Sequence, residues 1–341
     1  MADTRTFASC ADGGTMSVHS GRDTAIDIAK AFAILLMVVG HCSALPWAVL
    51  NLILSFHMPL FFIFSGYFYR PKPLREVFFQ GNRHLLKPYL IATSCCVLLC
   101  LTAQNIDEAK YRLLGIVMCN GGFYDGRLLP NSGALWFLPA LYWCKIFYAW
   151  LSGKTRKCFL WSFMLSMVAL LVGRFCFNLP LGLLVGMSGM VYYAIGHYWH
   201  SRLKVSLNKV VLLVGIAVWL YCAHYEYLNM FGFACSLYPV SMFAAFIGTY
   251  VTWMVACKTP RTLRPVLCWI GRNTLLVLCY HRVNELVWMN MGHWLFKEGG
   301  ILYTPQTEMM YHDPILATCV NLLLTLTMTY LHTRLSRCNK V

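Results

Sequence analysis

Residues 55–70 read SFHMPLFFIFSGYFYR, a stretch whose centre is as apolar as a membrane span. The same stretch carries the imidazole of His57 and ends in charge at Arg70. Because polar side chains at membrane depth cost free energy, each of them marks a candidate functional site. The stretch therefore predicts a site inside a membrane-embedded helix.

The composition predicts an all-α integral membrane protein. Of the 341 residues, 59% are hydrophobic and 12% are charged, whereas a soluble domain has about 25% charged residues. Mostly apolar runs long enough to cross a bilayer recur along the whole chain. We expect about ten transmembrane helices, at residues 24–43, 47–69, 86–103, 134–152, 158–174, 180–198, 207–224, 232–256, 266–288 and 314–332.

The basic residues alternate between the loops that join these spans. With the N-terminus inside, the inner segments hold 19 Lys and Arg and the outer segments hold 5. Cytoplasmic loops are enriched in Lys and Arg, so we expect both termini to be cytoplasmic. The formal charge of +15 is spread over several short segments, which argues against nucleic acid and suits lipid headgroups or coenzyme A.

Three regions are expected along the chain: a disordered cytoplasmic tail (1–21), a ten-helix transmembrane domain (22–335) and a short basic cytoplasmic tail (336–341). Residues 1–20 lack the apolar run of a secretory signal. The 16 cysteines lie mostly in apolar stretches without zinc-like spacing, so we expect free thiols. The long outer loops at about 104–133 and 289–313 are binding surfaces or simple connectors.

The first expected span places three ionisable side chains on one stripe. Asp27 and Lys30 are spaced i, i+3, and His41 follows Lys30 by 11 residues, which is close to three full turns and about 16 Å along the axis. Lys30 then lies near the cytoplasmic face and His41 in the outer half of the membrane. The alternative is a surface pair in which Lys30 extends to the interface.

The second span carries His57 at about mid-membrane, followed by Pro59, which favours a kink. Ser65 and Gly66 allow another helix backbone to approach closely. His57 is either a functional imidazole or a hydrogen-bonded core histidine.

The ninth span has Arg272 near its inner end and His281 in its outer half. Glu285 follows His281 at i+4 and can orient or charge it. Trp136 is a site residue or part of an aromatic belt, and Lys145 has no assigned role.

The three histidines, His41, His57 and His281, indicate a proton-handling site. An imidazole can deprotonate a hydroxyl that attacks an activated acyl group. The same residues, with Asp27 and Lys30, would suit the proton relay of a transporter or flippase, although no internal repeat is evident. A structural or sensory membrane protein is a third hypothesis. No close-spaced ligand pair supports a metal site, so no metal is expected.

Four motifs, in this order, resemble the acyltransferase-3 family, in particular its O-acetyltransferase (fucose 4-O-acetylase-like) branch: IDIAKAFAILLMVVGH, FHMPLFFIFSGYFYR, LWFLPALY and WIGRNTLLVLCYH. The resemblance covers about residues 22–335. It implies ten core helices that transfer an acyl group, usually acetyl, from cytosolic acyl-CoA to an extracytoplasmic glycan or other hydroxyl acceptor. The family's basic-x10-His motif falls on Lys30 and His41, where most members have Arg in place of Lys, and its second-span motif falls on His57, Pro59, Ser65 and Gly66.

Together with the expected geometry of the spans, the resemblance leads to a hypothesis for the roles of these residues in a protein of the cell membrane. His41 would be the general base or a transient acyl carrier, and His57 and His281 would assist it. Acetyl-CoA or another acyl-CoA would be the donor, and a carbohydrate or lipid-linked glycan the acceptor. The expected donor-binding and substrate-binding residues are Asp27, Lys30, Arg70, Arg75, Arg272 and Trp136.

Overall fold

The computed structural model describes residues 23–103, 105–124, 127–175, 179–202, 209–225, 228–235, 237–295, 301–302 and 304–338. The expected tail at 1–21 lies outside the described residues, as does the end of the tail at 336–341. Helices dominate the described chain, and each expected span contains at least one of them. The first half of the chain forms α1 (Thr24–Val39), α2 (Trp47–Leu54), α3 (His57–Tyr67), α4 (Leu74–Gly81), η1 (Asn82–Leu86), α5 (Lys87–Thr102), α6 (Ile106–Met118), η2 (Gly133–Trp136), α7 (Phe137–Ser152) and α8 (Cys158–Phe175).

The second half forms η3 (Pro180–Gly182), α9 (Leu183–Ser188), α10 (Met190–Arg202), α11 (Lys209–Tyr225), α12 (Tyr238–Cys257), α13 (Arg264–Arg272), α14 (Thr274–Leu295), α15 (Pro305–Tyr311) and α16 (Pro314–Cys338). Two antiparallel hairpins complete the described chain: β1 (Asn120–Tyr124) with β2 (Arg127–Asn131), and β3 (Leu228–Asn229) with β4 (Ala234–Cys235).

Six helical segments of the described chain are long and apolar enough to cross a membrane: Trp47–Tyr67, Leu74–Thr102, Gly133–Ser152, Cys158–Phe175, Tyr238–Cys257 and Pro314–Cys338. The all-α membrane class is therefore confirmed, but a count of ten spans is not. The remaining four expected spans correspond to short, broken or more polar helices. α1 has 16 residues, α11 has 17, α9 and α10 are separate helices, and α14 carries the polar residues of the ninth span.

The expected second span is broken into α2 and α3 at Ser55 and Phe56. Pro59 lies in the first turn of α3, where a helix needs no backbone N–H donor. A proline ring clashes with the carbonyl four residues earlier, and here that carbonyl belongs to Ser55 at the break. The interruption therefore begins one turn before the proline, and it places His57 at the very start of α3.

Both of the long loops that were expected on the outer side contain helices, where simple connectors were one alternative. α6 begins after Asn105, whose side chain accepts a hydrogen bond from the Glu108 backbone N–H at 3.0 Å. Arg112 and Glu108 then form an i, i+4 ion pair at 2.6 Å, and α6 packs against α5. A cap and an ion pair of this kind stabilise a helix in its first turns. α15 lies in the second outer loop.

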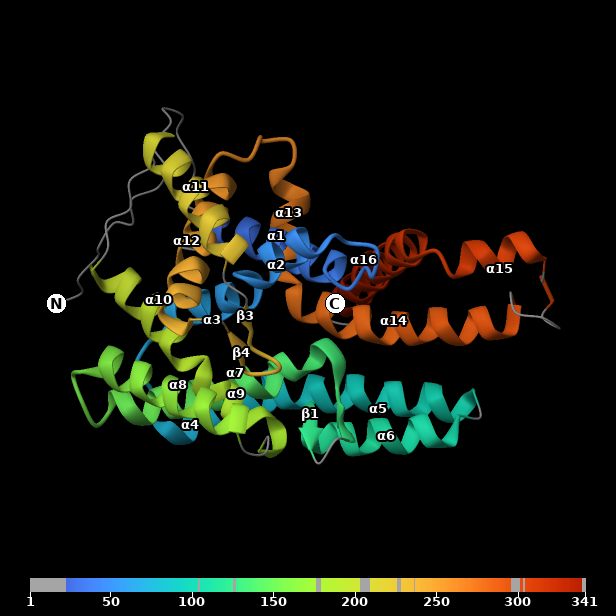
Figure 1. Ribbon diagram of the computed structural model, residues 1–341, viewed down its shortest axis with the longest axis horizontal. Coiled ribbons are helices and arrows are strands. Elements are labelled where there is room, and N and C mark those ends of the chain that lie inside the picture. The colour runs from blue at the N-terminus through green and yellow to red at the C-terminus, as the bar shows by residue number, and fades with distance from the viewer. Residues whose placement is uncertain are drawn as a thin grey trace.

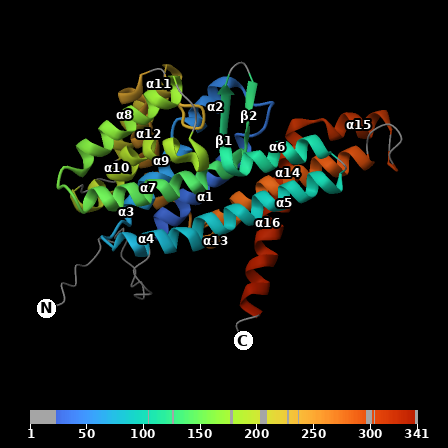
Figure 2. The same ribbon diagram turned by 90° about the horizontal axis from the view of Figure 1, so that it is seen from below.

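The core forms mainly from α1, α3, α7, α10 and α12, toward the left of Figure 1. The backbones of α3 and α10 are in close contact, because a Cβ at Gly66 would lie 1.9 Å from the Tyr193 carbonyl oxygen and one at Gly196 would lie 1.8 Å from that of Ile63. Helices α5, α6, α14 and α15 extend away from this cluster in both views (Figures 1 and 2). α14 packs against α1, α5 and α16 and so joins the two parts.

The 14 cysteines of the described chain are all free thiols. Helices α5, α8 and α16 expose large apolar side chains along their length. Such surfaces are expected of helices that face lipid.

Candidate active site

Asp27 anchors two cations at one end of α1. Its carboxylate is almost fully buried, and it pairs with Lys30 Nζ at 2.9 Å and with Arg272 Nε at 3.2 Å. The backbones are in contact as well, since a Cβ at Gly271 would lie 1.7 Å from the Asp27 carbonyl oxygen. α13 therefore packs directly on α1, and three of the predicted donor-binding residues form one cluster.

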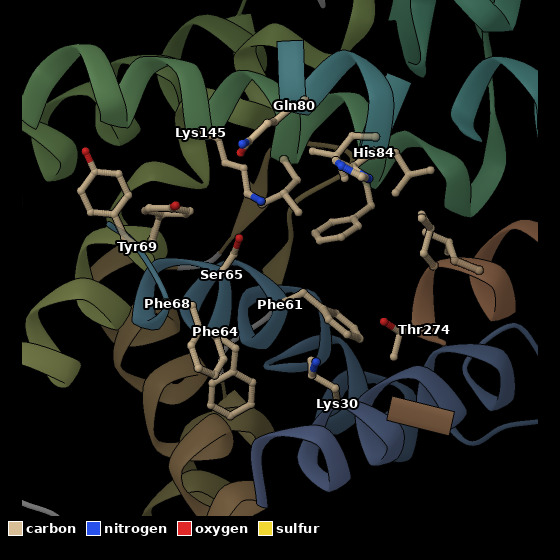
Figure 3. Close-up of a pocket in the computed structure, with 18 of the residues that line it drawn as sticks. Lys30, Phe61, Phe64, Ser65, Phe68, Tyr69, Gln80, His84, Lys145 and Thr274 are labelled. Atoms are coloured by element: carbon tan, nitrogen blue, oxygen red, sulfur yellow. The ribbon is translucent and has the colours of Figure 1, made fainter. Parts of the chain in front are cut away.

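Lys30 also lines a cavity of about 580 Å³, called here the inner cavity. Its walls come from α1, α3, α4, η1, α7, α10 and α14. Figure 3 shows the amine of Lys145 projecting into this space toward Ser65, while Lys30 and Thr274 point in from the opposite side. Arg70 and Lys72 lie on the segment between α3 and α4 that borders the cavity.

The inner cavity is polar at one end and apolar at the other. Along α1 its lining changes from Lys30 through Ile34 to Met37, and along α14 from Thr274 to Leu278. α3 and α7 show the same order, from Ser65 and Lys145 at the polar end to apolar lining residues at the other: Met58, Phe61, Leu138 and Leu141. The polarity of the lining therefore decreases in the same direction along all four helices.

His41 and His281 meet beyond the apolar end. Their ring centroids are 5.1 Å apart with the ring planes tilted by 35°. α1 ends at Val39, so His41 lies in the turn that follows the helix and not on a continuous helical stripe as expected. Both rings line a second cavity of about 430 Å³, called here the outer pocket.

The outer pocket is formed by the end of α1 together with α14, α15 and α16. Glu285 lies in its wall and pairs with Arg282. The ring centroids of Trp288 and Tyr311 lie 5.6 Å apart. The Tyr311 hydroxyl donates a hydrogen bond to the Met289 carbonyl at 3.0 Å. Burial raises the pKa of the Tyr311 phenol, so the hydroxyl remains protonated near neutral pH.

A chain of hydrogen bonds from α16 fixes the orientation of His281. The Asn284 amide donates to the Thr325 hydroxyl, which donates to Asn321 Oδ1. The Asn321 amide is therefore free to donate to His281 Nδ1, at 3.1 Å. A neutral His281 then carries its proton on Nε2, an atom that is buried and has no hydrogen-bond partner among the described residues.

His57 is buried and makes a different contact. Its Nδ1 lies 2.8 Å from the carbonyl oxygen of Ile53, which can only accept a hydrogen bond. Nδ1–H must therefore be the donor, and Nε2 of a neutral His57 is left as the acceptor. His57 precedes Met58, which lines the inner cavity.

The predicted site residues thus divide between three places. The inner cavity and its rim take Asp27, Lys30, Ser65, Arg70 and Arg272, and the outer pocket takes His41 and His281. Gly66 supports the α3–α10 contact. Five predicted residues outside the Asp27 cluster line neither cavity. Three of them, His57, Pro59 and Gly66, lie on α3. The other two are Arg75, whose guanidinium lies 5.7 Å from the centroid of the Phe79 ring, and Trp136, which is buried against Phe137 and Phe231.

Several lining residues had no predicted role in the sequence. In the inner cavity they are Tyr69, Lys72, Gln80, His84 and Lys145, and in the outer pocket Ser43, Tyr311, His312 and Asn321. Only Lys145 carried a signal, because it is a charged residue within an apolar span. No group of three metal-ligating side chains occurs within the described ranges.

A family model described as an acyltransferase domain matches residues 23–334 of the chain. No curated protein and no solved structure matches this chain. The match covers nearly the whole transmembrane region, including α1, α3, α7 and α14, which carry the motifs quoted above. The chain therefore belongs to the acyltransferase-3 family and is a multi-pass membrane acyltransferase.

Proposed function

We propose that the protein transfers an acyl group, in the simplest case acetyl, from cytosolic acyl-CoA to a hydroxyl of a cell-surface or lipid-linked carbohydrate. One observation carries this proposal: α1 with the turn that follows it, and α14, each present a polar residue, then apolar lining, then a histidine. The two cavities are thus arranged in series along the same two helices, a charged one followed by one that contains imidazoles.

The inner cavity suits the donor. Coenzyme A has a highly charged phosphorylated nucleotide and a long, nearly neutral pantetheine arm. The cations at the polar end would bind the phosphates, while the arm would follow the apolar lining toward the histidines. Between Thr274 and His281 the axis of α14 advances by about 10 Å, which is within reach of an extended pantetheine arm.

The outer pocket suits the acceptor. Its polar and aromatic lining offers hydrogen bonds and a stacking surface, as sugar hydroxyls and sugar rings require. Glu285 and Arg282 neutralise each other, so the pocket places no strong demand on the charge of the acceptor.

The reaction would proceed by proton removal and acyl transfer. His41 takes the proton of the acceptor hydroxyl, and the oxygen attacks the thioester carbonyl carbon. The C–O bond forms, the C–S bond breaks, and the thiolate of CoA receives the proton. His281, held with Nε2–H available, would donate a hydrogen bond to the oxyanion or to His41. His57 would accept or relay a proton through Nε2.

The orientation of the protein is part of the proposal. The stretch from the end of α3 to the start of α5, part of which borders the inner cavity, carries Arg70, Lys72, Arg83 and Lys87. Cytoplasmic segments between membrane spans are enriched in such residues. The inner cavity would therefore open to the cytoplasm, with the full count of about ten spans, both termini inside, and the cell membrane as its location.

Substitution of His41 tests the mechanism. We expect His41→Ala to lower transfer of radiolabelled acetyl from acetyl-CoA to surface glycan by at least about a hundredfold, the usual contribution of a general base. His332→Ala is the matched control, since His332 bonds Tyr280 and lines neither cavity. Transfer by His41→Ala at the wild-type rate would refute the mechanism. An intact acetyl-CoA pool with the wild-type protein would instead favour a transporter.

A further inference from the structure

Lys145 is a charged residue on a stripe of α7 that is otherwise apolar. Leu138, Leu141 and Lys145 are spaced i, i+3 and i+7, and all three line the inner cavity. Residues at this spacing share one face of a helix, so Lys145 faces the same space as the two leucines. Figure 3 shows its amine within the cavity.

A lysine within a membrane span usually keeps its charge by extending its side chain to the interface or by pairing with a carboxylate. Lys145 does neither. It lies seven residues before the end of α7, about 10 Å along the axis, and its side chain points into the cavity. It forms no ion pair with any residue that the structure describes. Lys30 and Lys72, by contrast, pair with Asp27 and Glu76.

The charge around the cavity is of one sign. Lys30, Arg70, Lys72 and Lys145 line it together with His84, while no Asp or Glu belongs to its described lining. An unpaired cation in a mostly apolar space is costly unless a bound anion compensates it. The ligand of this cavity should therefore bring negative charge as far in as Lys145.

Depth distinguishes between the anionic groups of coenzyme A. Arg70 and Lys72 lie on the segment that joins α3 to α4, whereas Lys145 lies in the middle of α7. In coenzyme A the pyrophosphate is attached directly to the pantetheine arm, and the 3′-phosphate lies beyond it on the ribose. Entry of the arm toward the apolar end would bring the pyrophosphate to Lys145 and leave the 3′-phosphate near the mouth.

On these grounds, and resting on the proposed function, we infer that Lys145 forms a subsite for the pyrophosphate of the donor. The subsite adds a cation on α7 to those on α1 and on the α3–α4 segment. Lys145 thereby sets the preference of the enzyme for a nucleotide thioester over a thioester of pantetheine alone. It touches the substrate far from the reacting carbonyl, so its effect is on donor binding.

The test compares three donors: acetyl-CoA, 3′-dephospho-acetyl-CoA and S-acetylpantetheine. We expect Lys145→Met to raise KM about tenfold for the first two donors, the loss typical of one charged hydrogen bond. The variant should leave KM for S-acetylpantetheine unchanged, and kcat unchanged for all three. Lys145→Arg should restore most of the affinity. Lys154→Met is the matched control, because Lys154 is an exposed lysine just after α7 and outside the cavity.

The outcomes separate the inference from the proposed function. An equal rise in KM for all three donors would mean a structural role, and a rise limited to acetyl-CoA would place the 3′-phosphate at Lys145; either result overturns the inference. Calorimetric binding of CoA and of pantetheine is the second measurement. A tenfold weaker binding of CoA to Lys145→Met, with no acetyl transfer by the wild type, would uphold the subsite and reject the proposed acyl transfer.

Discussion

The inner cavity and the outer pocket share two lining helices, α1 and α14, but their polar groups differ in kind. In the inner cavity the charged groups are cations that gather at one end. Lys30 and Lys72 are held by ion pairs, and Lys145 is left available for an anion. In the outer pocket the polar groups are imidazoles, amides and hydroxyls joined by directional hydrogen bonds. The first arrangement suits binding and the second suits proton transfer, so variants in the two places should change different kinetic constants.

The largest effect is expected in the outer pocket, from His281→Ala. Loss of the Nε2–H donor beside His41 should lower kcat by about a hundredfold, with KM for acetyl-CoA within about twofold of wild type because the inner cavity is untouched. Steady-state transfer kinetics with detergent-solubilised protein measure both constants. A rise in KM without a change in kcat would show that the division between the cavities is wrong.

A smaller effect, of the opposite kind, is expected from Lys30→Met. Removing this cation should raise KM for acetyl-CoA by about tenfold and leave kcat nearly unchanged. Arg272 would remain paired with the Asp27 carboxylate, which limits the damage to the fold. Lys30→Arg keeps the charge and is expected to lie close to wild type. A loss of kcat alone would place Lys30 in the chemical step.

The smallest effect is expected from Asn321→Leu, which removes the hydrogen bond to His281 Nδ1 but leaves the imidazole in place. One neutral hydrogen bond contributes about 1 kcal/mol, so kcat should fall about fivefold. The pH profile should also shift, because both tautomers of His281 become accessible. Thr325→Val removes a group that lies one hydrogen bond further from His281, so it should change kcat less. A profile identical to that of the wild type would mean that Asn321 only fills space.

Much of the helical architecture could be predicted from the sequence because it depends on local composition. Apolar runs determine where most helices lie, and the Asp27–Lys30 pair follows from i, i+3 spacing on α1. The break before His57 was also foreseeable, since Pro59 restricts the residues one turn earlier. α6 was harder to predict, because its capping residue Asn105 and its ion pair lie in a segment of mixed polarity.

The site itself depended on information that no single segment contains. The approach of His41 to His281 requires α1 to pack beside α14, and the role of Asn321 requires α16 to pack there as well. Lys145 was visible as a charge in an apolar span, but only the packing of α7 shows that it faces the cavity. The sequence likewise could not show that Trp136 is buried among aromatic rings and lines neither cavity.

The arrangement of the cavities in series also has an electrical consequence. In acyl transfer the attacking oxygen and the leaving sulfur are bonded to the same carbon, so the acceptor proton and the CoA thiolate arise side by side at the histidines. Withdrawal of CoA to the inner side as a thiolate would leave that proton behind and move one charge across much of the membrane. Moving one charge against a membrane potential of 100 mV costs about 2.3 kcal/mol. Transfer of the proton from His41 to the sulfur before CoA withdraws avoids this cost. Outward acylation would then be electroneutral, and its rate would be insensitive to the membrane potential.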